Sequence, residues 1–213
     1  LEYYDAWMEI ADIPVAYTPY FTHPDPTVKR RSGFLVPRTG GSTYLGQTIT
    51  TPYYHAFSPS KDLTLTPTIT TKERLLLAGE YREQFSNGKI ESRGSLTYDS
   101  KNKVRGNIDS KGRFDINRQW RWGFDANKAS DDTYLRLYNY KSSQTLTSKV
   151  FVEGFSRRNY LSFRGYNFQN TSAEDNVQRS PIVLPAIDYS YVSDIGALGS
   201  RSSFDASSVV MTR

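Results

Sequence analysis

The sequence has no cysteine, only two histidines and no long hydrophobic run. The absence of cysteine excludes disulfides and thiolate metal sites within these 213 residues. The mean hydropathy is −0.61, and no window approaches the roughly 18 apolar residues of a membrane-spanning helix. This does not exclude a membrane protein built from strands, because a barrel strand turns only every second side chain toward lipid.

The scarcity of histidine also argues against an enzyme. His23 and His55 each lie near a proline, and neither has the spacing of a metal site or a catalytic triad. Ser32-Gly33 lacks the strand–turn–helix context of a nucleophile elbow. A phospholipase or deacylase on a barrel wall would need a Ser–His pair, and His55 is the only histidine expected within a strand. We therefore expect no catalytic site, no cofactor and no metal.

The net charge is +5 and the pI is about 9.3, values that suit a polyanionic partner such as nucleic acid or an anionic lipid. The basic residues are spread thinly, however, with runs only at residues 29–31 and 157–158. No nucleic-acid recognition module is present. We therefore expect no nucleic-acid binding.

The segments between turns are rich in Thr, Ser, Asn, Tyr and Phe, which favour strands over helices. The strictest alternation places Leu63, Leu65, Pro67 and Ile69 between successive threonines. A period of two with opposite faces apolar and polar fits a barrel wall with lipid outside and water inside. It fits a half-solvated soluble sheet equally well, and periodicity does not distinguish the two.

Later strands carry their charges on one face. The segment 90–98 alternates apolar or small residues with polar ones, and the segment 120–125 alternates aromatic residues with Arg121, Gly123 and Asp125. An Arg or Lys that faces lipid near the membrane centre costs about 2–4 kcal/mol. We therefore predict that the polar side chains line an aqueous lumen. The candidates are Glu91, Arg93, Thr97, Arg121 and Asp125.

The aromatic side of that last segment consists of Trp120, Trp122 and Phe124. Aromatic residues grouped in this way suit the interfacial girdle of a barrel, where rings meet lipid headgroups. The alternative is the aromatic core of a soluble sheet.

Short and long connections tend to alternate along the chain. Asn87-Gly88 predicts a tight hairpin, residues 157–159 a short turn, and residues 126–147 a long loop with a helical turn or strand at 134–138. In barrels the long loops are normally extracellular. The chain begins and ends inside strand patterns, so we expect about ten strands that form an arc of a larger barrel.

The N-terminal part has a different character. Residues 1–22 predict strands broken by Pro14 and Pro19, and residues 23–26 a linker. Arg30, Arg31, Ser32 and Gly33 then separate this part from the alternating strands. We interpret them as a hinge with a basic rim at a membrane face; a solvated basic loop is the alternative.

Two prolines interrupt the first alternating strands. Pro52 divides the predicted strand 47–57, and Pro67 lies within the next one. Proline lacks a backbone donor, so each weakens one ladder by about 0.5–1.5 kcal/mol net. On neighbouring strands beside the seam of a barrel, two such defects lower the cost of parting it. The alternative is that they mark strand ends or bulges.

Four blocks together carry a family resemblance: residues 13–21, 30–37, 52–54 and 62–67. In order and spacing they closely resemble the LPS-assembly outer-membrane protein family LptD, also called organic solvent tolerance protein. The resemblance is strong over roughly residues 8–85, and only the barrel character matches beyond.

The resemblance implies an all-β fold, in which the end of a periplasmic β-jellyroll is followed by the first strands of a large antiparallel transmembrane β-barrel. Residues 1–28 would belong to the jellyroll, 29–43 to the hinge, and 44–213 to the N-terminal portion of the barrel. The expected location is the cell outer membrane, with the N-terminal end periplasmic.

The implied function is insertion of lipopolysaccharide into the outer leaflet. Sugars would pass through the lumen and acyl chains through a lateral gate, where the resemblance favours a role for Pro52 and Pro67. The implied partners are lipopolysaccharide, the plug lipoprotein LptE and a periplasmic bridge protein. Two alternatives stay open, a passive porin-type barrel and a soluble β-sandwich binding module.

Overall fold

The computed structural model describes residues 1–10, 12–22, 27, 30–140, 143–171, 181–196 and 199–212. These residues form two antiparallel sheets, one of two strands and one of thirteen, and a single short helix. The predicted all-β fold is confirmed. No helix in the described ranges is long and apolar enough to cross a membrane.

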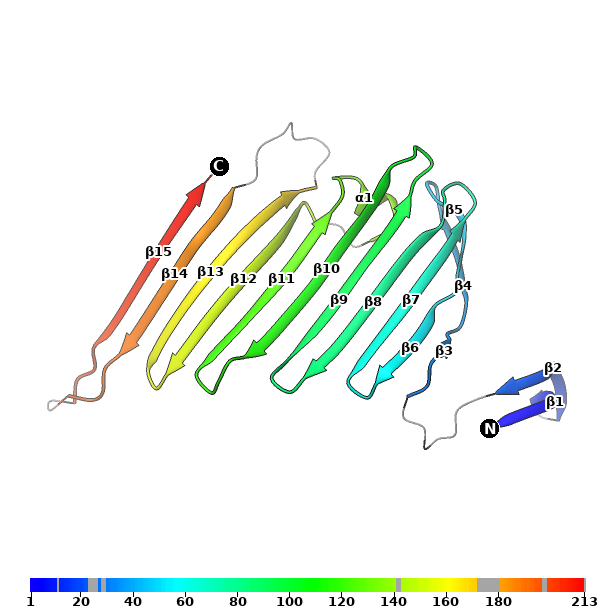
Figure 1. The fold of residues 1–213 in the computed structure, drawn as a ribbon, viewed down its shortest axis with the longest axis horizontal. Coiled ribbons are helices and arrows are strands. Elements are labelled where there is room, and N and C mark those ends of the chain that lie inside the picture. The colour runs from blue at the N-terminus through cyan, green and yellow to red at the C-terminus, as the bar shows by residue number, and fades with distance from the viewer. Residues whose placement is uncertain are drawn as a thin grey trace.

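The small sheet is a hairpin of β1 (Glu2–Ile10) and β2 (Ile13–Thr22). The Trp7 and Tyr17 rings lie 5.0 Å apart across it. Pro19 lies within β2, and Pro14 pairs with Glu9 at a register shift. Proline is tolerated at such irregularities because the ladder there already lacks a bond. Figure 1 shows the hairpin separate from the large sheet.

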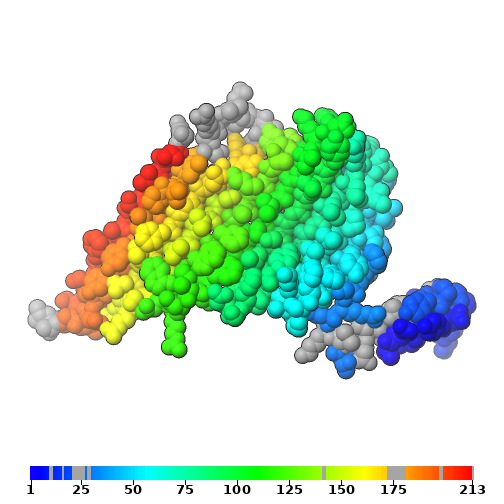
Figure 2. Space-filling view, in the orientation of Figure 1, coloured from blue at the N-terminus to red at the C-terminus, as the bar shows by residue number. Residues whose placement is uncertain are grey.

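The large sheet is a meander of slanted strands (Figure 1). Its first strands are β3 (Gly33–Phe34), β4 (Arg38–Ser42), β5 (Gly46–Thr50), β6 (Tyr53–Ser58) and β7 (Lys61–Thr70). The next are β8 (Leu76–Phe85), β9 (Gly88–Tyr98), β10 (Val104–Asp115) and β11 (Trp120–Ala129). After helix α1 (Tyr134–Leu137) follow β12 (Thr145–Ser156), β13 (Asn159–Asn170), β14 (Ile182–Val192) and β15 (Ser203–Thr212). Figure 2 shows these strands as one continuous wall.

The two outermost strands on the N-terminal side are broken. β3 pairs with β6 and β4 with β5, while β7 pairs with both β5 and β6. The breaks fall at residues 35–37 and 51–52, the second at Pro52 as the sequence predicted. Residues 33–34 and 38–42, which the sequence placed in the hinge, are thus the edge strand of the large sheet.

The register gives this sheet two unlike faces. The apolar face carries Leu65, Ile69, Leu77, Leu96 and Ile108, whose exposed fractions range from 39% to 65%. Among the described strands no second layer packs over this face. The sheet therefore does not match the sandwich alternative, in which these side chains would fill a closed interior.

The two ends of the sheet also differ. Two-residue turns at 59–60, 86–87 and 157–158 lie at one end, together with the four-residue turn 116–119. The opposite end carries the five-residue connections 71–75 and 99–103 and the long segment 130–144. The hairpin at Asn87-Gly88 is where the sequence predicted it. The long loop is shorter than the predicted 126–147, because residues 126–129 belong to β11 and 145–147 to β12, and the helical turn or strand expected at 134–138 is helix α1. The connection 193–202 is an exception, because it is long yet lies at the end with the tight turns.

Candidate functional site

The face opposite the apolar one is covered with ion pairs. The register pairs Arg93 with Glu80 and Arg121 with Glu153, and both pairs form salt bridges, at 2.9 and 2.8 Å. Antiparallel neighbours place directly opposed side chains on the same face, so a basic residue on one strand meets an acidic residue on the next. We call this the charged face.

The predicted lumen residues all lie on the charged face. Arg113 of β10 forms a 2.6 Å ion pair with Asp125, and Lys89 pairs with Glu91 at 3.1 Å. Thr97 differs from the others because it is only 3% exposed. Its hydroxyl donates to the Leu75 carbonyl at 3.0 Å, so it is covered rather than open to solvent.

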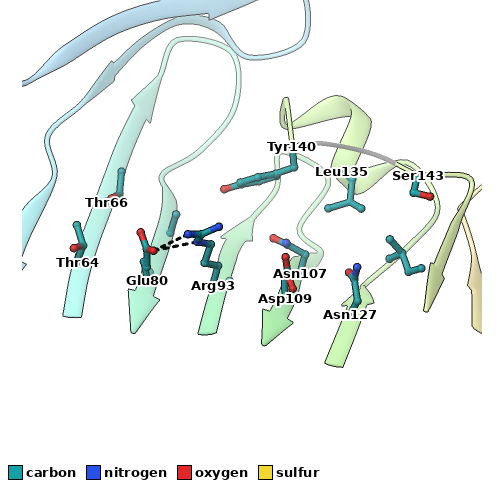
Figure 3. Close-up of a pocket in the computed structure, with 14 residues that line it drawn as sticks. Thr64, Thr66, Glu80, Arg93, Asn107, Asp109, Asn127, Leu135, Tyr140 and Ser143 are labelled. Atoms are coloured by element: carbon teal, nitrogen blue, oxygen red, sulfur yellow. Dashed lines mark hydrogen bonds and ion pairs between the residues drawn. The ribbon is translucent and has the colours of Figure 1, made fainter. Parts of the chain in front are cut away.

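The charged face has a hollow of about 480 Å³ beside the long segment 130–144 (Figure 3). Its wall carries the Glu80–Arg93 ion pair, and the Tyr140 ring projects over it. The other polar side chains that line it are Thr64, Thr66, Asn107, Asp109, Asn127 and Ser143. The hollow therefore offers hydrogen-bonding groups and an aromatic ring, with only Leu135, Leu146 and Ala78 as apolar side chains in its lining.

The segment containing α1 folds onto the charged face. Tyr134 is fully buried, its hydroxyl lies 2.7 Å from that of Ser95, and its ring stacks on Tyr138 at 4.6 Å. The buried hydrophobic cluster that forms there consists of Leu45, Leu76, Tyr134, Leu135, Tyr138 and Leu146. The long loop is thus packed against the sheet near its long-loop end.

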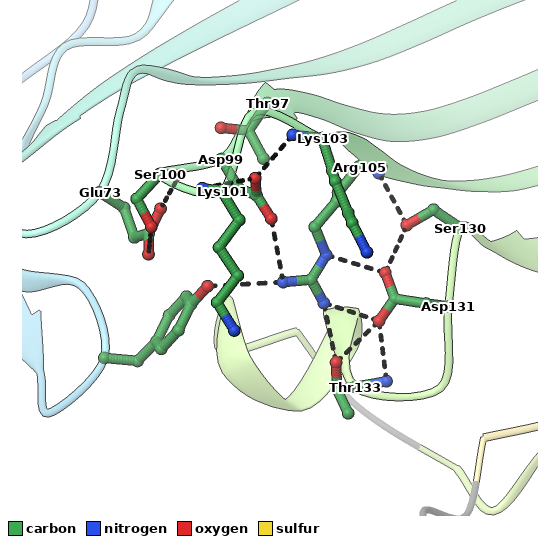
Figure 4. Close-up of polar contacts among 12 residues, drawn as sticks. Glu73, Thr97, Asp99, Ser100, Lys101, Lys103, Arg105, Ser130, Asp131 and Thr133 are labelled. Atoms are coloured by element: carbon green, nitrogen blue, oxygen red, sulfur yellow. Dashed lines mark hydrogen bonds and ion pairs between the residues drawn. The ribbon is translucent and has the colours of Figure 1, made fainter.

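Arg105 of β10 joins this segment to the sheet (Figure 4). Only 9% of Arg105 is exposed. Its Nε and Nη2 donate to the two carboxylate oxygens of Asp131 at 2.8 and 2.6 Å, and Nη2 also donates to the Thr133 hydroxyl. The guanidinium lies 5.5 Å from the Tyr134 and Tyr138 ring centroids. A planar donor between a carboxylate and two rings is the geometry that arginine favours.

The environment holds these groups in fixed charge states. Burial acts to raise the pKa of Asp131, but hydrogen bonds from Arg105, Thr133 and Ser130 outweigh it and hold the pKa well below its usual range. Burial raises the pKa of Tyr134 to about 12. At neutral pH the loop is therefore held by a charged carboxylate and neutral phenols.

The predicted gate prolines lie on neighbouring strands, one register position apart. The Thr51 amide donates to the Pro67 carbonyl at 3.1 Å, and the Leu35 amide donates to the Pro52 carbonyl at 2.8 Å. The N and O of a strand residue face the same neighbour. Each proline therefore accepts one bond and cannot return the other, which leaves the β3–β6 and the β5/β6–β7 ladders each one donor short.

The structure adds Pro37, which the sequence reasoning missed. It lies in the break between β3 and β4, on the edge strand itself. The signal was available, because Pro37, Pro52 and Pro67 are evenly spaced along the chain. All three lie close to one row across the first three strands, at the N-terminal edge of the sheet.

The predicted hinge residues are attached to the β6–β7 hairpin. Arg30 forms a 3.2 Å ion pair with Asp62 and donates to the Pro59 carbonyl. The Ser32 hydroxyl accepts the Ala56 amide at 2.9 Å, and Gly33 pairs with Tyr54. Arg31 is exposed beside them. The chain therefore joins the sheet at the end with the tight turns, and residues 30–33 are fixed there.

Exposed aromatic rings gather on the apolar face near the same end. Trp122 is 37% exposed and stacks on Phe114, with 4.8 Å between ring centroids. Phe85 lies 5.7 Å from Phe114 on the other side. Trp120, Trp122 and Phe124 share this face as predicted, and no layer within the described residues covers them.

A family model described as "LptD: LPS transport system D" matches residues 103–213, just over half of the chain. The chain belongs to the LptD family. Its likeness thus extends well past the N-terminal blocks that carried the resemblance in the sequence.

Curated relatives support the same assignment. The chain is 30% identical to the LPS-assembly protein LptD of Shewanella denitrificans, over 91% of this chain and 26% of that protein. It is 34% identical to that of Alkalilimnicola ehrlichii, over 73% and 21%, and 31% identical to that of Pectobacterium atrosepticum, over 92% and 26%. The chain thus spans about a quarter of the length of these relatives. They are named as assembly proteins and not as enzymes, in agreement with the prediction of no catalytic activity.

Proposed function

We propose that this chain forms part of the wall of an outer-membrane translocon that inserts lipopolysaccharide into the outer leaflet. The observation that carries the proposal is a single sheet with an exposed apolar face, a charged face and an edge whose ladders lack donors at Pro52 and Pro67. In this proposal the apolar face meets lipid and the charged face lines the lumen, with Glu91, Arg93, Arg121 and Asp125 among its residues and Thr97 beneath them.

The two faces suit the two parts of an amphipathic lipid. Sugars would pass along the charged face, where the hollow beside Tyr140 offers hydrogen-bonding groups. Acyl chains would leave through a lateral gate at the N-terminal edge of the sheet. A backbone group without a partner in lipid costs several kcal/mol, so an edge already short of donors is the cheapest place to part a wall.

The orientation follows from the two ends of the sheet. Tight turns normally face the periplasm and long loops the exterior. The chain joins the sheet at the tight-turn end through Arg30 and Pro59, which supports a periplasmic N-terminal end. We assign residues 1–28 to the end of a periplasmic jellyroll, 29–43 to the connection and 44–213 to the barrel, with the edge strand β3–β4 already part of its wall.

The partners follow from the same proposal. They are lipopolysaccharide, the plug lipoprotein LptE within the lumen, and a periplasmic bridge protein that delivers lipid to the N-terminal domain. The names of the curated relatives refer to LPS assembly, which supports the first of these.

The test uses the full-length protein in its native membrane. Pro52→Ala with Pro67→Ala supplies amides facing Leu35 and Thr51, each about 0.5–1.5 kcal/mol of added ladder stability. We expect slower appearance of newly made lipopolysaccharide at the cell surface. Pro181→Ala, just before β14 and away from this edge, is the matched control and should leave the rate unchanged. A passive porin would show unchanged surface lipopolysaccharide in the double variant, which would contradict the proposal.

A further inference from the structure

The part of the edge strand near the tight turns, β3, has little backbone pairing of its own. β3 contributes only two paired residues, Gly33 with Tyr54 and Phe34 with Tyr53. The next bond, from the Leu35 amide to the Pro52 carbonyl, cannot be returned. Something other than the ladder must therefore keep β3 on the sheet.

Two side-chain contacts add to the β3 ladder: the Ser32 hydroxyl accepts the Ala56 amide at 2.9 Å, and Arg30 pairs with Asp62. Asp62 is the second residue of β7, is 2% exposed and lies on the charged face. One carboxylate oxygen lies 3.2 Å from Arg30 Nη1, and the other accepts from Arg82 Nε at 2.8 Å. A buried carboxylate is costly unless it is paired. Here one carboxylate has three partners: Arg82 and the Tyr54 hydroxyl, at 3.4 Å, within the sheet, and Arg30 at the start of the edge strand.

The two arginines have different positions. Arg82 is on β8, next to Asp62 in the register, and pairs with it inside the sheet. Arg30 precedes β3 and also donates to the Pro59 carbonyl at 2.9 Å. Of these two arginines only Arg30 belongs to the connection from the N-terminal part, which the Ser32 hydroxyl also holds at Ala56, whereas Arg82 can balance the buried charge within the sheet.

We propose that Asp62 is a positioning residue that holds β3 against β6 through Arg30, so that the gate yields at the proline row while the end of the first strand near the tight turns stays on the sheet. This rests on the lateral-gate function proposed above. Without the Asp62–Arg30 anchor, the ladder that lacks a donor at Pro52 would let β3 separate from β6 along its whole length. The connection to the N-terminal domain would then move away from the sheet together with β3.

The attachment is tested in the full-length protein in its native membrane, with Phe34→Cys and Tyr53→Cys. These positions are directly opposed and lie next to the hydrogen-bonded pair of Leu35 and Pro52, so they form a close, non-hydrogen-bonded pair. The rate of disulfide formation is measured only in the fraction that runs as a folded barrel in unheated gel samples.

In that background Asp62→Asn and Arg30→Gln should each slow disulfide formation by about fivefold, as expected for loss of one charged hydrogen bond. Their double variant should be no slower than either. Arg82→Gln, the matched control, removes the same charge from the same carboxylate and should leave the rate unchanged. An unchanged rate in Asp62→Asn, or equal slowing by Arg82→Gln and Arg30→Gln, would overturn the proposal.

A second readout separates the anchor from the transport function. Asp62→Asn should slow delivery of lipopolysaccharide to the surface, and oxidation of the Phe34→Cys and Tyr53→Cys pair should restore it by returning β3 to β6. Slow disulfide formation without any effect on delivery would support the anchor and reject the gate at this edge. Slow delivery that oxidation does not restore would reject the anchor as its cause.

Discussion

Arg105 and Asp131 face each other through two parallel hydrogen bonds, of 2.8 and 2.6 Å, that join a strand of the sheet to the loop before α1. Asp131 also accepts the backbone amide and the hydroxyl of Thr133. The carboxylate therefore fixes the start of the helical segment and its position on the sheet at once, and the loop behaves as part of the wall.

Arg105→Lys should loosen this segment. Lysine keeps the charge but has no planar pair of donors, so we expect a loss of about 1.5–3 kcal/mol. Faster protease cleavage within residues 130–144 at the cell surface measures it. Arg93→Lys is the control, because its side chain is 66% exposed and exposed pairs contribute only about 0.2–1 kcal/mol. Equal cleavage of the two variants would contradict this role.

The same segment should detach at alkaline pH. Burial raises the pKa of Tyr134 to about 12, above the usual value of about 10. A raised pKa means that folding favours the protonated phenol, so its stabilising effect is complete below about pH 10 and is lost as the pH rises through about 12. Protease sensitivity of the loop should rise over that range. Tyr134→Phe cannot ionise and should shift the rise to higher pH; an identical profile would show that another group controls it.

Neighbouring residues on opposite faces test the membrane assignment. Ile108 is 46% exposed on the apolar face, and Asn107 lies on the charged face beside it in sequence. Ile108→Lys should cost about 2–4 kcal/mol if that face meets lipid near the membrane centre, and Asn107→Lys much less. The amount of folded protein in the outer membrane measures both. A soluble sheet would tolerate lysine at either position.

The Trp120 ring lies directly against Gly154, which has no side chain to displace it. A Cβ on Gly154 would lie 2.7 Å from the Trp120 ring, whereas one on Gly79 would meet Leu65 at an ordinary 3.7 Å. Gly154→Ala should displace the indole and cost about 1–3 kcal/mol, the usual range for overpacking. Tryptophan fluorescence and the temperature of barrel unfolding report the two effects. Gly79→Ala, on the same face, should change neither quantity. A similar loss of stability in Gly79→Ala would show that the loss in Gly154→Ala does not come from contact with Trp120.

The sequence by itself determined the class of fold and the two faces. The alternation around Leu65 and Ile69, and again around Trp122, fixes which side chains share a face, because successive strand residues point in opposite directions. Asn87-Gly88 similarly fixed a hairpin, since a tight turn depends only on its own residues. These are local properties, and the structure has them as predicted.

Only the tertiary structure decided which residues far apart in the sequence come into contact. Arg105 lies near Tyr44, 61 residues away, and no periodicity predicts that a polar loop would fold inward onto the charged face. The same holds for Arg30 at Asp62. The physical reason is that a strand's pattern specifies its faces but not its neighbours, and these contacts arise only when register and loop packing bring distant segments together.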